Sequence, residues 1–84
     1  MTKLEEKLKE LGYELFYITN LYQYGKRFNM GYITILTDTE NKQIIRSFIA
    51  PIAITNQRNI DSLQQAFNEM QKDLEELRKY EIRD

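Results

Sequence analysis

The sequence predicts an α+β fold with the element order α-β-β-β-α, in which a three-stranded antiparallel meander has both helices packed on one face. Three observations predict it. Leucines near the N-terminus are spaced for one helical face, three central segments are rich in aromatic and β-branched residues, and the C-terminal part repeats apolar residues every three or four positions. Because 84 residues suffice for one small core, we expect a single domain over residues 1–84.

The first helix is expected over about residues 2–11. Its leucines are spaced four, three and four residues apart, which places them on one face. Thr2 and Glu5 match the capping box, in which the hydroxyl caps a backbone N–H and the carboxylate reaches back. Gly12 ends the helix because it adopts a left-handed conformation without steric cost.

The central segments predict three strands joined by short turns. The expected strands span about residues 13–22, 28–37 and 43–50. Residues 23–27 are polar and contain a glycine, so we expect them to form a hairpin connection, and residues 38–42 contain turn-forming residues. Pro51 marks the end of the third strand because it cannot donate a ladder hydrogen bond.

The last helix is expected over about residues 60–80. From Ile60 to Leu77, apolar residues follow spacings of three and four, which predicts an amphipathic helix about 30 Å long. Asn59 or Asp61 can cap its N-terminus. Its final turns can overhang the sheet, so Leu77 and Tyr80 are candidate contacts in a homodimer.

The alternation of side chains along a strand divides the sheet residues into two sets. We expect the mostly isoleucine set to face the helices: Phe16, Ile18, Gly31, Ile33, Ile35, Ile45, Ser47 and Ile49. The other set, with aromatic, hydroxyl and Arg side chains, is expected on an open face: Leu15, Tyr17, Thr19, Met30, Tyr32, Thr34, Leu36, Ile44, Arg46 and Phe48. A one-residue bulge would swap part of a strand between the sets.

The absence of Cys and His excludes several kinds of site. Without Cys there is no disulfide, thiolate metal site or cysteine nucleophile. Without His the chain lacks the commonest general base near neutral pH and the usual ligand of catalytic zinc. We therefore expect a non-enzymatic protein without metal or cofactor.

The N-terminal residues and the apolar runs predict the location of the protein. The first ten residues are charged throughout, unlike a secretory signal. The longest apolar run is far shorter than the ~20 residues of a membrane-spanning helix. Together with the lack of Cys, this predicts a cytoplasmic protein without a membrane partner.

The expected open face is the first candidate site. Tyr17, Tyr32, Arg46 and Phe48 are the proposed partner-binding residues, because Tyr and Arg combine apolar area with hydrogen bonding and dominate binding hot spots. Aromatic residues on a sheet also stack the bases of single-stranded nucleic acid. The alternative is that these residues simply suit a pleated, solvated surface.

A second candidate site is the expected hairpin connection. Tyr22, Tyr24, Lys26 and Arg27 form an aromatic and basic cluster that can contact phosphate or an acidic partner. The alternative is an ordinary solvated hairpin tip. Residues 13–59 carry five basic and three acidic groups, a net charge of +2, whereas residues 60–84 have a net charge of −3. So small a positive charge supports few phosphate contacts.

The α-β-β-β-α order resembles that of the double-stranded RNA-binding domain. That family carries a lysine cluster at the start of its last helix and a histidine-bearing loop, whereas residues 56–59 carry one basic residue and the chain has no His. The order, small size and acidic balance are also similar to some phage-encoded inhibitors of bacterial defence nucleases, at the level of the fold alone. No motif assigns the chain to a family.

These observations favour a non-enzymatic protein-binding module that uses the open face of its sheet. Residues with AT-rich codons number 36, against 12 with GC-rich codons, which favours a low-GC bacterium or its phages as the source. A small accessory or inhibitor protein of a phage or mobile element is the most concrete form of this hypothesis. The alternatives are a nucleic-acid-binding domain that uses the sheet aromatics and the Lys26/Arg27 connection, and a structural homodimer.

Overall fold

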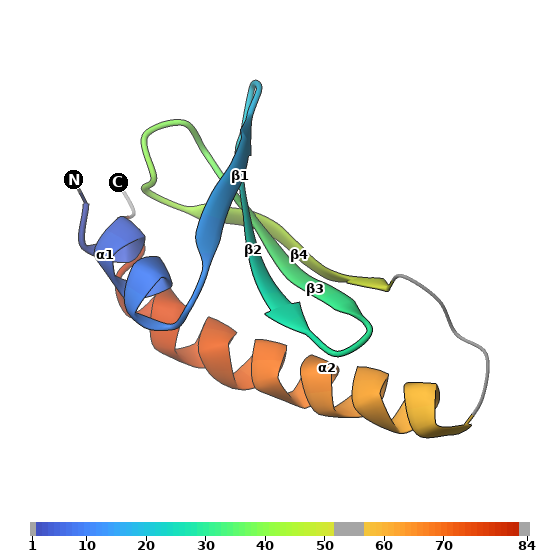
Figure 1. Cartoon of the computed structure of the whole chain (residues 1–84). Helices are drawn as coiled ribbons and strands as arrows, with labels where there is room; N and C mark the ends of the chain where they lie inside the picture. Colours follow the sequence, from blue (N-terminus) through green and yellow to red (C-terminus); the bar gives the residue numbers. More distant parts are fainter. Residues whose placement is uncertain (1, 52–56, 83–84) are drawn as a thin grey trace.

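The computed structural model describes residues 2–51 and 57–82 (Figure 1). The elements in chain order are α1 (Lys3–Glu10), β1 (Glu14–Ile18), β2 (Tyr22–Phe28), β3 (Gly31–Thr37), β4 (Ile44–Pro51) and α2 (Gln57–Arg78). All neighbouring strands are antiparallel, in the sheet order β1-β2-β3-β4. The α+β class is therefore confirmed, but the sheet has four strands, and the prediction of three was wrong.

The extra strand comes from the segment that was expected to connect two strands. β2 covers residues 22–28, and the chain instead turns at residues 19–21, where Thr19 N–H donates to the carbonyl of Leu21 over 3.0 Å. β2 alternates strictly, with Tyr22, Tyr24, Lys26 and Phe28 on one side. Because one of these four is a lysine, the alternation does not look apolar in the sequence.

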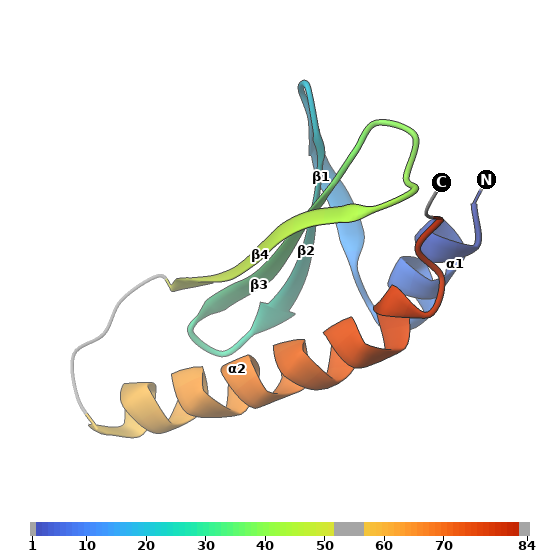
Figure 2. The same ribbon diagram turned by 180° about the vertical axis from the view of Figure 1, so that it is seen from behind.

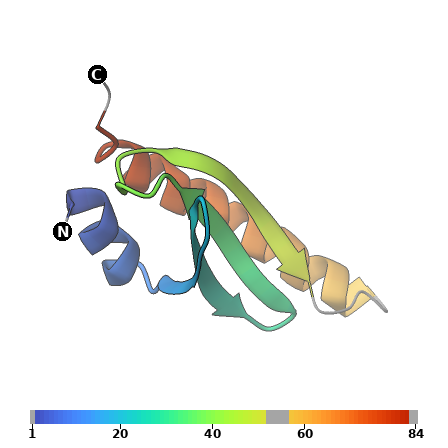
Figure 3. The same cartoon turned by 90° about the horizontal axis from the view of Figure 1, so that it is seen from above.

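The helices form a second layer on one side of the sheet. α2 runs beneath the sheet, and α1 packs beside the C-terminal end of α2 (Figures 1 and 3). The hairpin of β1 and β2 rises away from α2 at its tip (Figure 2). We call the side of the sheet toward α2 the inner face and the opposite side the outer face.

The core lies between the inner face and the helices. Apolar residues from both helices, from β2 and β3 and from the connection between α1 and β1 are almost fully buried there: Leu4, Leu8, Tyr13, Tyr24, Ile33, Ile35, Ala66, Met70, Leu74 and Leu77. The capping box predicted for α1 is confirmed in part, because Thr2 Oγ1 accepts from Glu5 N–H at 3.2 Å. Gly12 ends the turn after α1 with φ of 99°, a conformation that favours glycine.

The predicted division of side chains between the two faces is correct for β3 but is changed by bulges in β1 and β4. In β4 the register shifts next to Leu36, so Ile44 turns inward and Ile45, expected in the core, is 53% exposed. In β1 the register shifts between Leu15 and Tyr17, so Phe16, also expected in the core, packs on the outer face. Ile18, expected in the core too, is 64% exposed near the hairpin tip.

A buried polar network joins β2 to α2. Asp73 Oδ2 accepts from Tyr13 Oη at 2.8 Å and from Lys26 Nζ at 2.9 Å, and the side chain of Asp73 is almost fully buried. Lys26 also lies 3.4 Å from Glu69 Oε1 and 5.2 Å from the centre of the Tyr13 ring. Burial and then the hydrogen bond to Asp73 raise the pKa of Tyr13, which keeps its hydroxyl protonated as a donor. Lys26 is therefore a structural side chain.

Asn41 joins the 38–43 turn to β2, β3 and α1. Its Oδ1 accepts from Tyr24 Oη at 2.9 Å and from Thr37 Oγ1 at 2.7 Å. Its carbonyl accepts from Thr2 Oγ1 at 3.0 Å. The residue has φ of 54°, which Asn tolerates better than most other residues.

We expect the burial of Tyr24 to make the stability fall at alkaline pH. Burial, followed by the charge of Glu5, raises the pKa of Tyr24 from 10.0 to about 12. Between about pH 10 and pH 12 the unfolded chain loses this proton and the folded chain keeps it, so Tyr24 lowers the free energy of unfolding by about 1.4 kcal/mol per pH unit. Urea unfolding of wild type and Tyr24→Phe across this range isolates the effect, because lysine titration is common to both chains. Equal slopes for the two chains would contradict it.

Candidate binding site on the outer face of the sheet

Side chains on the outer face form three rows across β2, β3 and β4. In order along the strands, the rows are Gln23–Leu36–Arg46, Gly25–Thr34–Phe48 and Arg27–Tyr32–Ala50. Both described helices lie on the other side of the sheet, so neither covers these rows (Figures 1 and 2). This is the face that an antiparallel sheet can leave open to water or to a partner.

Phe16 crosses from β1 onto the middle row because Gly25 has no side chain. A Cβ atom at Gly25 would overlap the Phe16 ring, so the glycine provides the space in which this ring lies. The edge of the ring meets Tyr32, with ring centres 5.2 Å apart and planes at 89°. The bulge in β1 turns Phe16 to this side of the sheet. The contact gives the outer face a fixed aromatic wall.

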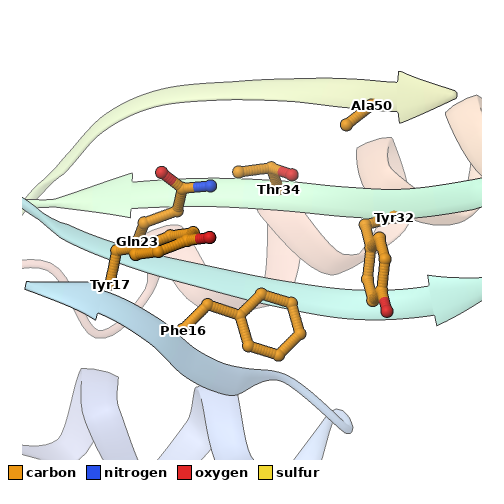
Figure 4. A pocket seen from close by; sticks show the side chains of 6 residues that line it. All are labelled: Phe16, Tyr17, Gln23, Tyr32, Thr34 and Ala50. Carbon is orange, nitrogen blue, oxygen red and sulfur yellow. The ribbon is translucent and has the colours of Figure 1, made fainter. Parts of the chain in front are cut away.

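A hollow of about 470 Å³ lies beside this wall (Figure 4). It is lined by Phe16, Tyr17, Gln23, Tyr32, Thr34 and Ala50. The lining is mainly aromatic and apolar, with the Gln23 amide and the hydroxyls of Tyr17, Tyr32 and Thr34 as its polar groups. The hollow suits a flat or apolar group that makes few hydrogen bonds, as an anchor side chain of a protein partner does.

Two arginines lie at opposite corners of the three rows. The Arg27 guanidinium lies 5.6 Å from the centre of the Tyr32 ring, and the Arg46 guanidinium lies 5.5 Å from the centre of the Phe48 ring. Stacking on a ring restricts the guanidinium while its N–H groups stay free to donate at the edge. Both side chains are exposed. The face can therefore bind anionic groups on both sides of the hollow.

The first predicted site set lies together on this face. Tyr17 and Tyr32 line the hollow, while Arg46 stacks on Phe48 in the adjoining rows. Whether these four residues bind a partner stays a prediction. The sequence interpretation missed Phe16, Gln23 and Arg27 as neighbours of this set. The isolated glycine at position 25 was a signal, because glycine within a strand often marks a close approach of another group.

The second predicted site set does not form one surface. Its residues lie on a strand and not in a hairpin tip, so alternation separates them. Tyr24 is buried, Tyr22 packs against the core, and Lys26 is bound to Asp73. Arg27 is the member that reaches the outer face. The prediction of a basic Lys26/Arg27 loop was therefore wrong.

Of the two residues predicted as a dimer contact at the end of α2, Leu77 is corrected, and whether Tyr80 contacts a second copy stays a prediction. Leu77 is fully buried in the core and has no surface to offer a second copy. Tyr80 is half-buried against the same core, with Lys7 Nζ 5.9 Å from its ring centre. The 3-4 periodicity of α2 fits packing against the sheet and α1, as most amphipathic helices of small domains do.

Neither helix has the length and hydropathy that a membrane-spanning helix requires, over residues 2–51 and 57–82. In the same part of the chain, no three acidic side chains are grouped closely enough to hold a metal ion. Comparisons of the chain with protein-family models, with curated proteins and with solved structures give no match.

Proposed function

We propose that this chain is a non-enzymatic protein-binding module and that the outer face of its sheet is the interface. The observation that carries the proposal is the hollow beside the Phe16–Tyr32 contact, together with the two ring-stacked arginines, on a face that neither described helix covers. Rigid aromatic side chains lose little conformational entropy on binding, and aromatic residues and Arg contribute most at protein interfaces.

The concrete form of this proposal is a small cytoplasmic accessory or inhibitor protein of a phage or mobile element. Its support is indirect: the chain is small, lacks Cys and His, and has the composition of a low-GC source. An inhibitor of this kind needs no chemistry of its own, because covering a surface of its target is sufficient.

Single-stranded nucleic acid is the second candidate, favoured by the aromatic walls and by the Gln23 amide in the hollow. Bases can stack on such rings, and an amide can bond to a base edge. The charge disfavours it, because Lys26 is turned inward to Asp73 and two arginines offer few phosphate contacts. A mobility shift of short oligonucleotides at low salt tests it, and binding would show a steep salt dependence.

A homodimer through the outer face is the third candidate. Face-to-face pairing would bring Arg27 and Arg46 of both copies into one interface, and like charges without counterions oppose association. Sedimentation at micromolar concentration separates a dimer from a monomeric binder.

The first experiment uses the wild-type chain and a Tyr32→Ala/Phe48→Ala variant as baits in a nuclease-treated lysate of a low-GC bacterium. We expect the variant to lose the proteins that wild type retains, because removing two anchors of an interface costs about 2 kcal/mol or more each. Both side chains are only partly buried on the side of the sheet away from the core, so the variant should still unfold cooperatively in urea.

Phe67→Ala is the matched control for this experiment. Phe67 is an aromatic residue of α2 that is 46% exposed and lies on the helix side of the sheet. This variant should retain the same proteins as wild type. Capture that is unchanged in Tyr32→Ala/Phe48→Ala, or lost equally in Phe67→Ala, would rule out the outer face as the interface.

A further inference from the structure

Charge is distributed unevenly between the two sides of the sheet. The four strands contain four charged residues: Glu14, Lys26, Arg27 and Arg46. Lys26 is paired with Asp73 on the inner face, whereas Glu14 on β1 pairs with Gly25 and so stands at the β1 end of the middle row of the outer face. Over β2, β3 and β4 the three rows carry two cations and no carboxylate, and with Glu14 of β1 the strands give the outer face a net charge of +1.

The two helices carry six basic and eight acidic residues, a net charge of −2, and one of these carboxylates, Asp73, is paired with Lys26. Apart from Glu14, the Asp and Glu residues in the described part of the chain belong to α1, α2 and the connections. A negatively charged partner is therefore favoured at the outer face over the helix layer. This polarity predicts an anionic partner surface.

The distance between the two arginines indicates how far apart the anionic groups of the partner must be. Arg27 and Arg46 lie in the outer two rows, on β2 and β4, with the hollow near the middle row. With ~4.8 Å between strands and ~3.4 Å per residue along them, their Cα atoms are about 17 Å apart. An extended peptide covers this distance in about five residues, so two carboxylates can reach both arginines while a side chain between them enters the hollow.

We propose that the outer face binds an extended acidic protein segment, with one carboxylate on Arg27, one on Arg46 and an apolar or aromatic anchor in the hollow. The inference rests on the proposed function and specifies its partner. A guanidinium and a carboxylate form two parallel hydrogen bonds, and Arg is suited to this geometry because its donors are planar and fixed. Two such pairs match a short acidic segment better than a phosphate backbone, whose binding draws on several contacts.

A phage-displayed library of random peptides, selected on the immobilised full chain, tests this partner chemistry. We expect the enriched peptides to carry Asp or Glu on both sides of an aromatic or aliphatic residue. Synthetic copies should bind about tenfold more weakly to Arg27→Gln and to Arg46→Gln than to wild type. Lys72→Gln, which removes the same charge from an exposed position on α2, should bind as wild type does.

The outcomes separate this inference from the proposed function. The enriched peptides could be neutral or basic, or could bind the Arg variants as tightly as wild type. Either result would overturn the inference of an acidic partner, and the outer face would remain the interface if Tyr32→Ala/Phe48→Ala abolished their binding. Enrichment that is insensitive to Tyr32→Ala/Phe48→Ala would overturn the outer face as interface as well. Arg-dependent binding of oligo-dT or oligo-rU, tighter than that of any selected peptide, would replace the protein segment with single-stranded nucleic acid.

Discussion

Replacing Asp73 with alanine is expected to lower the free energy of unfolding by about 3–5 kcal/mol, because removing one partner of a buried ion pair leaves the other charge buried and unpaired. The change leaves the Lys26 ammonium and the Tyr13 hydroxyl without their acceptor. Glu69 still lies 3.4 Å from Lys26 but is itself about half exposed, so it compensates for little. Small domains are stable by about 5–15 kcal/mol, so this loss is a large part of the total.

A double-mutant cycle tests whether the loss comes from the pair itself. Lys26→Met alone should be strongly destabilising, because it leaves the Asp73 carboxylate buried with the Tyr13 hydroxyl as its remaining partner. Lys26→Met/Asp73→Leu should recover part of the loss seen in Lys26→Met and in Asp73→Leu alone, since two apolar side chains can replace a buried ion pair at little cost while the Tyr13 hydroxyl still lacks its acceptor. Urea unfolding followed by circular dichroism measures all three chains.

Glu69→Ala is the control for this cycle. It removes the exposed partner of the same lysine and should change the free energy of unfolding by less than about 1 kcal/mol. A Glu69→Ala loss as large as that of Asp73→Ala, or additive losses in the double variant, would show that the buried pair is not what joins β2 to α2.

Leu77→Ala is the second change with a large expected effect. Leu77 of α2 is fully buried in the core. A Leu→Ala change at such a site costs about 3–5 kcal/mol of stability, because apolar burial is lost and a cavity remains. Ile60→Ala lies on the same apolar stripe of α2 but is about half exposed, so it should cost far less. Urea midpoints of the two variants measure the difference.

The result also decides between two roles of Leu77. A core residue changes stability and leaves the oligomeric state unchanged. If Leu77→Ala instead kept the urea midpoint of wild type and dissociated a dimer in sedimentation, the buried position described above would be wrong.

Local patterns in the sequence were sufficient for the helices and for one strand. The leucine spacing near the N-terminus and the 3-4 repeat before Leu77 each correspond to a helix, because amphipathic periodicity reports directly on the buried face. Ile33 and Ile35 were correctly placed in the core, since β3 is a central strand without a bulge of its own.

The same local patterns failed where an interaction crosses the chain. Residues 23–27 of β2 predict a connection because they are polar and contain a glycine. Lys26 can face the core only through its acceptor Asp73, which is 47 residues away. No window of neighbouring residues contains that pairing. Bulges had the same effect on Phe16 and Ile45, because one extra residue moves a side chain to the other face without changing the composition.

The α+β class, both helices and the isoleucine core of β3 can be predicted from the sequence, because each depends on the spacing of residues along the chain. The same is true of the shared face of Tyr17, Tyr32, Arg46 and Phe48, since alternation along a strand is a local property. The burial of Lys26 and the position of Phe16 over Gly25 beside the hollow follow from the three-dimensional fold instead. Those two outcomes depend on which distant groups come into contact, and a buried charge or a bulge is stable only once its partner is in place.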